Sequence, residues 1–548
     1  MHYNLVLHQY FEELKRTETS IEQLASIWHC SERYAKIVIK QLQQQQKVLW
    51  ETSQGRGKKP FLTLCQSKTD AVIQVLQQLW LQKKYEEVFQ LVKDVELQQN
   101  PSIQAWMNAQ FGLHALNEEH VFVQPMYFVE LFLDPLKAIS RHDMHILEQM
   151  HESLFIINER SEIESNLLFD YNSEDYRTWH FVLRKGVLFH NLEELTASDA
   201  VESIRYVKSY YKNVFTIESM QILGRYTFSI TLHKPLTILP NFLASIRFSV
   251  FYKGQEPTIG CGPFQLVTHT NERMRLQTFT RYFKQRPWID AVELIYQDFE
   301  ADVVSNFIFH TDVPYREIIS QEQGADFFAL NSTYGELTDR DKRAYIWHLI
   351  EPTRCIVDHE RETLAGSWLV GQSNKLPVEK TKKPYFSRPL VIGYQEIRQG
   401  VNHLYRVEPI QQLLLEQGIE STTVCIDLKH AHEKIEQKID IFVGGNALSD
   451  NLLLAYFMMY SSEPQIFFNF LLPESRQIAE YLLQQATSQK EGLACFKQIE
   501  QLLIDEYTLK FISHRKHYFY VREDTPYKHV EFDQHGRVNY RRIFYKDY

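Results

Sequence analysis

Apolar side chains near the start of the chain recur every three or four positions, which is the spacing of one face of a helix. The residues that carry a first predicted helix are Leu7, Tyr10, Phe11 and Leu14. A second helix is predicted over 20–28, because Thr19-x-x-Glu22 has the form of a capping box at its start. The pattern therefore predicts two helices in the first thirty residues.

A third helix is predicted from Ser31 to about Gln45, after the short turn His29-Cys30. Its apolar positions fall on one face and are Ala35, Val38, Ile39 and Leu42. Two helices joined by so short a turn are typical of a helix-turn-helix. Extended segments at 48–51 and 61–65 flank the polar stretch 53–60, which predicts a β-hairpin wing.

Polar and basic residues lie where a winged helix meets DNA. On the third helix and its cap, the predicted DNA contacts are Ser31, Arg33, Tyr34, Lys36 and Lys40. At the tip of the hairpin they are Arg56, Lys58 and Lys59. Phosphates and major-groove base edges attract such side chains. We expect a DNA-binding head; the alternative is a winged helix that makes only protein contacts.

Charge along the chain supports this division. Residues 1–66 hold nine Lys/Arg against six Asp/Glu, whereas the whole chain has a formal net charge of -10. A basic head on an acidic body suggests that binding to a polyanion is confined to the head. With 548 residues, 44% of them hydrophobic, the chain is long enough for several domains.

After the head, residues 70–116 have helical apolar spacing throughout, and Pro101 separates a last short helix that contains Trp106. We expect a helical connector, which either packs against its own chain or makes contacts in a dimer. From about residue 120, short strands alternate with helices, which indicates an α/β body.

Several segments of this body resemble a known family. The most specific are Phe132-Leu133-Asp134-Pro135, the block from Trp179 to His190, Gly260-Cys261-Gly262-Pro263-Phe264, and Pro287-Trp288-Ile289-Asp290. They resemble the family-5 solute-binding proteins, and the likeness runs from about 120 to 520. The resemblance implies a two-lobed α/β clamshell of the type II periplasmic-binding-protein class, closing on a ligand between its lobes. His151-Glu152-Ser153-Leu154 departs from the Tyr-Glu-Gly-Leu of many transport receptors, so a peptide ligand does not follow.

With the winged head added, the whole arrangement resembles SgrR-type transcription regulators. The expected fold is multidomain: a mainly α winged helix-turn-helix head over 1–68, a helical connector over 69–117, and the clamshell. Its first lobe is expected over 118–325, with 516–548 returning to it, and its second over 326–515. The resemblance implies a sensor of a small metabolite (sugar, sugar phosphate or peptide-like) that modulates binding to promoter DNA.

Candidate ligand contacts lie in the second lobe. Gly444-Gly445-Asn446 follows the apolar strand 439–443, at the carboxyl end where α/β sheets bind ligands, although an ordinary loop would explain it too. Pockets combine aromatic walls with a few placed polar groups. The predicted ligand contacts are Trp368, Tyr394, Gly445, Asn446 and Asp450.

The sequence predicts no catalytic site, no metal site and no cofactor. Gly260-x-Gly262 precedes a strand and lacks a third glycine, and no GxSxG or P-loop motif occurs. The pairs His142/His145 and His430/His432 have no carboxylate cluster beside them. The six cysteines are far apart and are expected to be free thiols.

No signal peptide and no apolar run of membrane-spanning length is recognised, so we expect a cytoplasmic protein without membrane contact. Its expected partners are double-stranded promoter DNA, a small-molecule ligand and a second copy in a homodimer. Two alternatives remain: a cytosolic solute-binding protein without DNA binding, and a regulator whose second part is a ligand-free scaffold.

Overall fold

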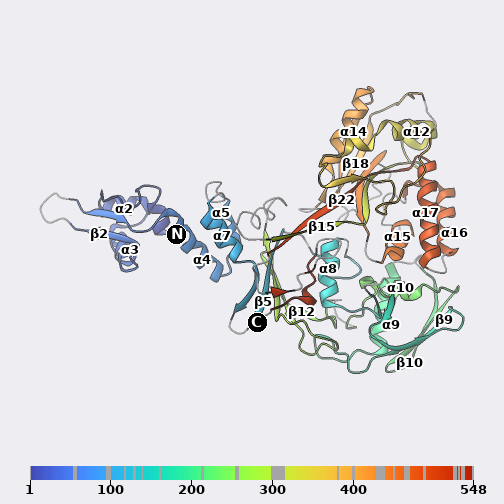
Figure 1. Ribbon diagram of the computed structural model, residues 1–548, viewed down its shortest axis with the longest axis horizontal. Coiled ribbons are helices and arrows are strands. Elements are labelled where there is room, and N and C mark those ends of the chain that lie inside the picture. The colour runs from blue at the N-terminus through green and yellow to red at the C-terminus, as the bar shows by residue number, and fades with distance from the viewer. Residues whose placement is uncertain are drawn as a thin grey trace.

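The computed structural model has three parts in chain order: a small head, a helical connector and a two-lobed body (Figure 1). It describes residues 2–52, 59–93, 100–116, 119–127, 131–138, 140–158, 162–210, 215–253, 258–297, 315–378, 382–397, 401–427, 438–448, 451–461, 469–485, 489–522, 527–528, 531 and 537–545. The head and the second lobe lie far from each other, at opposite sides of the picture. The multidomain fold class is confirmed.

The head is a winged helix-turn-helix. Its elements are α1 (Tyr3–Leu7), β1 (Thr17–Glu18), α2 (Ile21–Ile27), α3 (Glu32–Gln44), β2 (Val48–Glu51) and β3 (Phe61–Leu64). The strands form one antiparallel sheet in the order β1-β3-β2, which is the wing. Trp28 is buried in the core and donates its indole N–H to the carbonyl of Tyr3 at 3.1 Å. Three helices and a hairpin thus share one small core.

Two details of the head differ from the sequence prediction. The first helix ends at Leu7, and Leu14 lies 78% exposed with φ 56°, because its N–H bonds the carbonyl of Leu64 on the wing. The cap of α2 is Ser20, whose hydroxyl accepts a hydrogen bond from the backbone N–H of Gln23 at 3.1 Å. Thr19 is buried one residue earlier and bonds the side chain of Gln23, so the N-cap lies one residue later than the predicted capping box placed it.

The connector packs against its own chain. Its described helices are α4 (Lys68–Leu81), α5 (Tyr85–Val92) and α7 (Pro101–Ala109). Their apolar faces share a core with side chains of the first lobe, namely Val121, Val123, Ala291 and Ile295. Residues 112–116 were expected to be helical but form β4 (Gly112–Leu116), which pairs with a strand of the first lobe. The connector therefore continues directly into that lobe.

The first lobe contains two sheets. The sheet next to the connector has the order β12-β13-β14-β5-β4, with β12 (Phe264–His269), β13 (Arg273–Thr278), β14 (Ala291–Gln297) and β5 (Glu119–Tyr127). Its side chains alternate between faces, so Val121 meets the connector while Phe122 belongs to a second core, to which α8 (Arg141–Met150) contributes. The other sheet has the order β10-β11-β9-β8, with β10 (Ile217–Gly224), β11 (Thr227–Leu232), β9 (Thr178–Leu183) and β8 (Leu168–Asn172), and contacts α9 (Ala197–Tyr210).

The second lobe is one mixed sheet with helices packed on it. Its strands are β15 (Tyr315–Gln321), β16 (Gly324–Leu330), β17 (Glu362–Leu364), β18 (Leu390–Ile397), β19 (Val401–Asn402), β20 (Ser421–Asp427), β21 (Ile441–Ala447) and β22 (Leu509–Arg522). Its longer helices are α12 (Arg340–Leu349), α14 (Leu404–Glu416), α15 (Leu452–Ser461), α16 (Pro473–Gln485) and α17 (Gln489–Asp505). The strands β18, β20 and β21 run parallel, so their carboxyl ends meet at one edge.

Sheet pairing moves the predicted boundary between the lobes. Strand β15 and the start of β16 were assigned to the first lobe but pair within the second. Strand β22 stays in the second lobe's sheet as far as Arg522. The later residues Val538, Tyr540 and Ile543 are buried in the first lobe, where the sequence prediction had placed the returning C-terminal segment.

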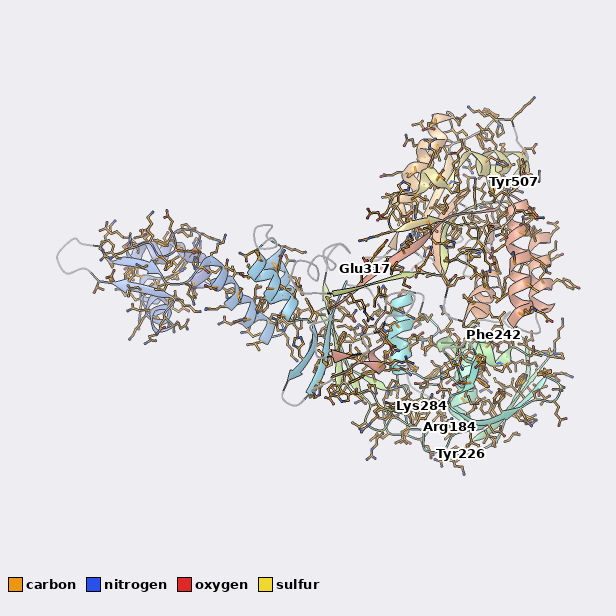
Figure 2. The ribbon with its side chains drawn as sticks, in the orientation of Figure 1. Arg184, Tyr226, Phe242, Lys284, Glu317 and Tyr507 are labelled. Atoms are coloured by element: carbon orange, nitrogen blue, oxygen red, sulfur yellow. The ribbon has the colours of Figure 1, made fainter. Side chains whose placement is uncertain are left out.

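Side chains fill both lobes, and Figure 2 labels examples in each. In the first lobe, Arg184 donates to the backbone carbonyl of Asn166 at 2.8 Å, and Lys284 donates to its side-chain oxygen. The side-chain amide of Asn166 in turn bonds the buried Glu152. In the second lobe, the labelled Tyr507 is buried and packs edge-on against Trp347.

Candidate DNA-binding face and ligand-binding edge

Helix α3 is positioned by its cap and by the turn before it. Ser31 is the N-cap, and its hydroxyl accepts a hydrogen bond from the N–H of Tyr34 at 3.3 Å. His29 adopts φ 49°, the left-handed conformation that ends α2, and the N–H of Cys30 then bonds the carbonyl of Ala25 at 2.9 Å. This closed turn sets the angle between the two helices.

The outward face of α3 carries the predicted DNA contacts. Ala35, Val38, Ile39 and Leu42 are buried, as the spacing predicted. Arg33, Tyr34, Lys36 and Lys40 are exposed on the remaining surface. Tyr34 also packs edge-on against Tyr3 with 6.1 Å between ring centroids, which fixes the start of the helix. The structure therefore brings four of the predicted side chains onto one helix, beside the cap Ser31.

The wing holds one cation that the sequence reasoning missed. The guanidinium of Arg16 lies over the ring of Phe61 at 3.6 Å and donates to Glu51 at 2.6 Å. Because its partners lie on β3 and β2, Arg16 ties the two strands of the wing together. Lys59 is exposed where the chain enters β3, whereas Arg56 and Lys58 lie outside the described residues.

In the second lobe, the described ligand candidates lie near one edge of the sheet. Gly445 and Asn446 are at the carboxyl end of β21, and Tyr394 is on the neighbouring β18. Trp368 is beside them, since its carbonyl accepts from the N–H of Gly324 at the start of β16. Its indole is fully buried, however, and donates to the hydroxyl of Tyr460 at 2.7 Å, so in this conformation it packs in the interior. Asp450 lies outside the described residues.

A buried cluster of charged side chains, here called the Asp326 cluster, lies directly against Gly445. Asp326 on β16 accepts from Arg406 on α14 at 2.9 Å, from Arg515 on β22 at 3.0 Å, and from the hydroxyl of Tyr405 at 3.2 Å. A Cβ at position 445 would collide with the Asp326 carboxylate and would approach His403 Nε2 to 2.8 Å. Only glycine fits at this position without a shift of the cluster.

Charge in this cluster is balanced inside the lobe. Arg406 is fully buried and also pairs with Glu362 at 2.6 Å. Burial would by itself raise the pKa of the Asp326 carboxyl, but Arg515, His403 and Arg406 outweigh it and hold the pKa well below its usual range. The Arg515 side chain is 32% exposed, so the cluster reaches the surface there. Asp326, Arg406 and Arg515 carried no signal in the sequence, because they lie on three elements far apart in the chain, β16, α14 and β22. His403 is the N-cap of α14.

The same edge of the second lobe touches the first lobe. The side-chain amide of Asn451, at the start of α15, donates to the carbonyl of Asn241 in α10 (Leu239–Leu243) at 2.7 Å. Helix α15 follows β21 in the chain, and its Met459 sulfur accepts from the side-chain amide of Asn446 at 3.3 Å. The segment that carries Gly445 and Asn446 thus leads into a contact between the lobes.

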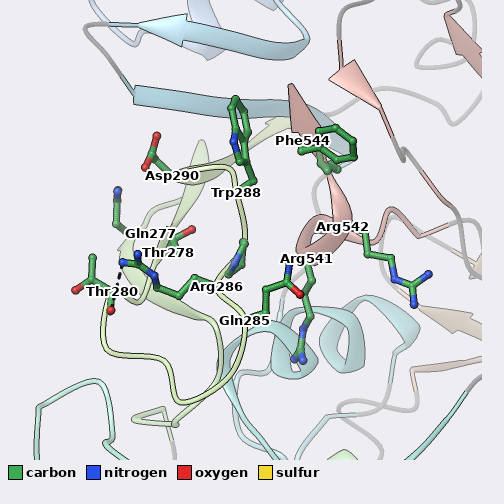
Figure 3. Close-up of a pocket in the computed structure, with 12 residues that line it drawn as sticks. Gln277, Thr278, Thr280, Gln285, Arg286, Trp288, Asp290, Arg541, Arg542 and Phe544 are labelled. Carbon is green, nitrogen blue, oxygen red and sulfur yellow. Dashed lines mark hydrogen bonds between the residues drawn. The ribbon is translucent and has the colours of Figure 1, made fainter. Parts of the chain in front are cut away.

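The first lobe contains a pocket of about 1010 Å³ between the 277–290 segment and the C-terminal residues 541–544 (Figure 3). Trp288 and Asp290 in its wall lie just before β14. They are therefore at the opposite end of that strand from Gln297, the last described residue before the second lobe. Arg541 bonds Glu152 at 2.9 Å and Arg542 bonds Glu531 at 3.0 Å. Both of these guanidinium groups in the pocket wall are thus already paired with carboxylates.

Among the residues that the structure describes, no three His, Cys, Asp or Glu side chains come together as a metal site. None of the described helices is both long enough and apolar enough to cross a membrane. His145 of the first histidine pair bonds the carbonyl of Val538 at 3.0 Å, and the pair His430/His432 lies outside the described residues.

Comparison with known proteins agrees with this architecture. Residues 1–112 match the family described as the N-terminal domain of sugar transport-related sRNA regulators, and residues 162–311 match the middle part of the bacterial extracellular solute-binding proteins, family 5. The chain is 24% identical over 364 residues to the HTH-type transcriptional regulator SgrR of Escherichia coli (strain K12), covering 64% of each chain. That alignment spans less than two thirds of the regulator's length.

A longer match is to the uncharacterized protein YhjP of Bacillus subtilis (strain 168), which is 22% identical over 524 residues and covers 89% of each chain. Among solved structures, a dipeptide-binding protein from Pseudoalteromonas sp. SM9913 in complex with Met-Leu superposes with a TM-score of 0.66 at 14% identity. That comparison covers 78% of this chain and all of the other, and it shows the two-lobed α/β fold.

Proposed function

We propose that the chain is a DNA-binding transcription regulator that senses a small metabolite, because its head matches the N-terminal domain of sugar transport-related sRNA regulators and its body matches the family-5 solute-binding proteins. The head binds promoter DNA through α3 and the wing. The two-lobed body binds the ligand at the carboxyl end of β21, beside Gly445 and Asn446. Ligand binding there changes the affinity of the head for promoter DNA. The protein acts in the cytoplasm, where its DNA is.

The observation that carries DNA binding is the outward face of α3. Arg33, Lys36 and Lys40 are exposed on a helix whose other face is locked into the head's core. A recognition helix presents its first turns to the major groove, and cations there meet phosphates and base edges. Lys59 is exposed in the wing of the same head, and wings of this kind contact the DNA backbone.

Ligand sensing is supported by the edge of the second lobe. Glycine at 445 keeps the backbone close to the Asp326 cluster, and Asn446 and Tyr394 add polar groups at the carboxyl end of parallel strands. Ligands of open α/β sheets bind at this end. The same segment leads to the Asn451–Asn241 contact, so a ligand here would favour one arrangement of the two lobes over another.

The test of DNA binding uses the full chain and fluorescent genomic fragments, including the DNA upstream of its own gene. Binding is measured across a salt series for the wild type and for Arg33→Ala/Lys36→Ala. We expect the double variant to bind at least tenfold more weakly, with a salt slope smaller by roughly 2, because two phosphate or base contacts are lost. The matched control is Arg205→Ala/Lys497→Ala, which removes the same charge from exposed sites on the body.

Equal binding by both variants would refute the assignment to α3. No salt-sensitive binding by the wild type would favour a solute-binding protein without DNA contact. Once a fragment is found, sugars, sugar phosphates and short peptides are screened for an effect on its affinity and on the protein's oligomeric state. A protein that binds DNA but responds to none of them, and whose Gly445→Ala variant behaves as wild type, would be the ligand-free scaffold.

A further inference from the structure

Ile37 is an exception on α3. Every other aliphatic side chain of this helix is buried, whereas Ile37 is 47% exposed. Isoleucine is a poorer helix former than the lysine and glutamine residues that occupy neighbouring exposed positions. Helix stability and the head's own core therefore give no reason for an isoleucine at this position.

The position of Ile37 is central on the outward face. At about 100° per residue, Arg33, Tyr34, Lys40 and Gln41 all lie within roughly 60° of it around the helix axis. Ala35, Ile39 and Leu42 point to the opposite side, into the core. Ile37 is thus an apolar side chain flanked by the cations Arg33 and Lys40, in the part of the face that would enter deepest into a groove.

The surrounding charge identifies the partner. An apolar side chain flanked by two cations complements a surface that is apolar at one point and negatively charged on either side. In the major groove of DNA, the apolar group on the base edges is the C5-methyl of thymine, with phosphates on both sides. We propose that Ile37 contacts a thymine methyl group and so contributes to sequence preference, an inference that rests on the proposed DNA binding by α3.

The experiment removes the methyl group without changing base pairing or phosphate charge. A fragment bound by the wild-type chain is made in two forms, one with its natural thymines and one with uracil in place of every thymine. We expect wild type to bind the uracil form about three- to tenfold more weakly, the effect of losing one or two buried methyl contacts. Ile37→Ala should bind the thymine form more weakly than wild type and should bind both forms equally.

The control is Ile222→Ala, which truncates an isoleucine of similar exposure, 53%, on β10 of the body and should keep the wild-type preference for thymine. Equal affinity of wild type for both forms would overturn the inference and would indicate that Ile37 serves a protein contact. An Ile37→Ala variant that still prefers thymine would overturn it too, by showing that another residue reads the methyl. Failure of wild type to bind any thymine fragment is a different result, since it refutes DNA binding itself.

Discussion

The cations on α3 and the cations of the Asp326 cluster have opposite surroundings. On α3 the head holds Arg33, Lys36 and Lys40 out in solvent, while the second lobe buries Arg406 against Asp326 and Glu362. An exposed cation costs the fold little and is available to a polyanion. A buried cation and its carboxylate partners depend on each other, because an unpaired charge in the protein interior costs several kcal/mol of stability. The head's cations should therefore matter for binding and the lobe's for stability.

The largest expected effect comes from breaking the buried cluster. Arg406→Met leaves Glu362 without its partner and removes one of the cations on Asp326, so we expect a loss of about 3–5 kcal/mol in unfolding free energy of the second lobe. Urea unfolding gives the loss, and hydrogen exchange of peptides from β16 and β22 places it. Asp326→Asn combined with Arg406→Met removes one charge of each sign and should recover part of it. A loss below 1 kcal/mol, or a matching loss of DNA affinity, would contradict the separation of roles.

The second effect concerns buried histidines in the first lobe. His151 is buried, and burial, with a smaller contribution from His190, lowers its pKa to about 3. The unfolded chain takes up a proton near pH 6.5 while the folded chain does not, so stability is full above pH 6.5 and falls as the pH drops toward 3. Between pH 7.5 and 5, His151 should account for about 2 kcal/mol of this loss.

Urea midpoints at the two pH values measure this dependence. His151→Phe should be less sensitive to acid than wild type, and His180→Phe, at an exposed position of the same lobe, should not change the sensitivity. If the His151 variant follows the wild-type curve, the ring is not buried in its neutral form.

A smaller effect is expected from the cap of the recognition helix. Ser31→Ala removes the hydrogen bond to the N–H of Tyr34 and should destabilise the head by about 1 kcal/mol. Ser20→Ala removes the equivalent bond on α2 and should destabilise the head as much. Thermal unfolding measures both, and DNA affinity should fall further for Ser31→Ala, because only that cap adjoins the proposed contact face. Equal affinities for the two variants would show that the cap acts only through stability.

The smallest effect on stability is expected from an ion pair at the surface of the second lobe. Arg354 makes a two-pronged pair with Glu416 at 2.9 and 2.6 Å, with both side chains more than 40% exposed. Water and salt screen such a pair, so Arg354→Ala should lower the unfolding free energy far less than Arg406→Met does. The two variants are compared by urea unfolding at low and high salt. A cost that equals that of Arg406→Met would mean that burial does not set the value of these pairs.

Sequence patterns predicted what depends on neighbours along the chain. The apolar face of α3, its cap Ser31 and the hairpin wing are confirmed because spacing and capping act over a few residues. The same reasoning predicted a first helix that extends beyond Leu7. The helix ends there, and the N–H of Leu14 bonds the carbonyl of Leu64, which is fifty residues away in the chain. Strand β4 was missed for the same kind of reason, since its partner β5 supplies the hydrogen bonds.

The ligand edge shows the limit of sequence reasoning most clearly. A strand followed by glycines predicted where Gly445 and Asn446 would lie in the fold, at the end of a parallel strand. Trp368 was chosen as an aromatic wall, yet its ring is enclosed by Phe327, Phe511 and Tyr460 from elsewhere in the lobe. Asp326 and Arg515 meet although 189 residues separate them, and no local pattern encodes such a meeting.

The apolar core shared by the connector and the first lobe determines which parts of the molecule move as one rigid unit. Tyr85 of α5 lies 3.5 Å from the buried carboxylate of Glu293 on β14, which Arg273 also holds at 2.6 Å, in the midst of a continuous apolar contact. Packing of this kind does not shear without losing many contacts at once. The connector and the adjoining sheet of the first lobe are therefore expected to move as one unit. The rest of the first lobe shares a buried apolar cluster with the second lobe, so any change in the arrangement of the lobes would have to alter that contact as well.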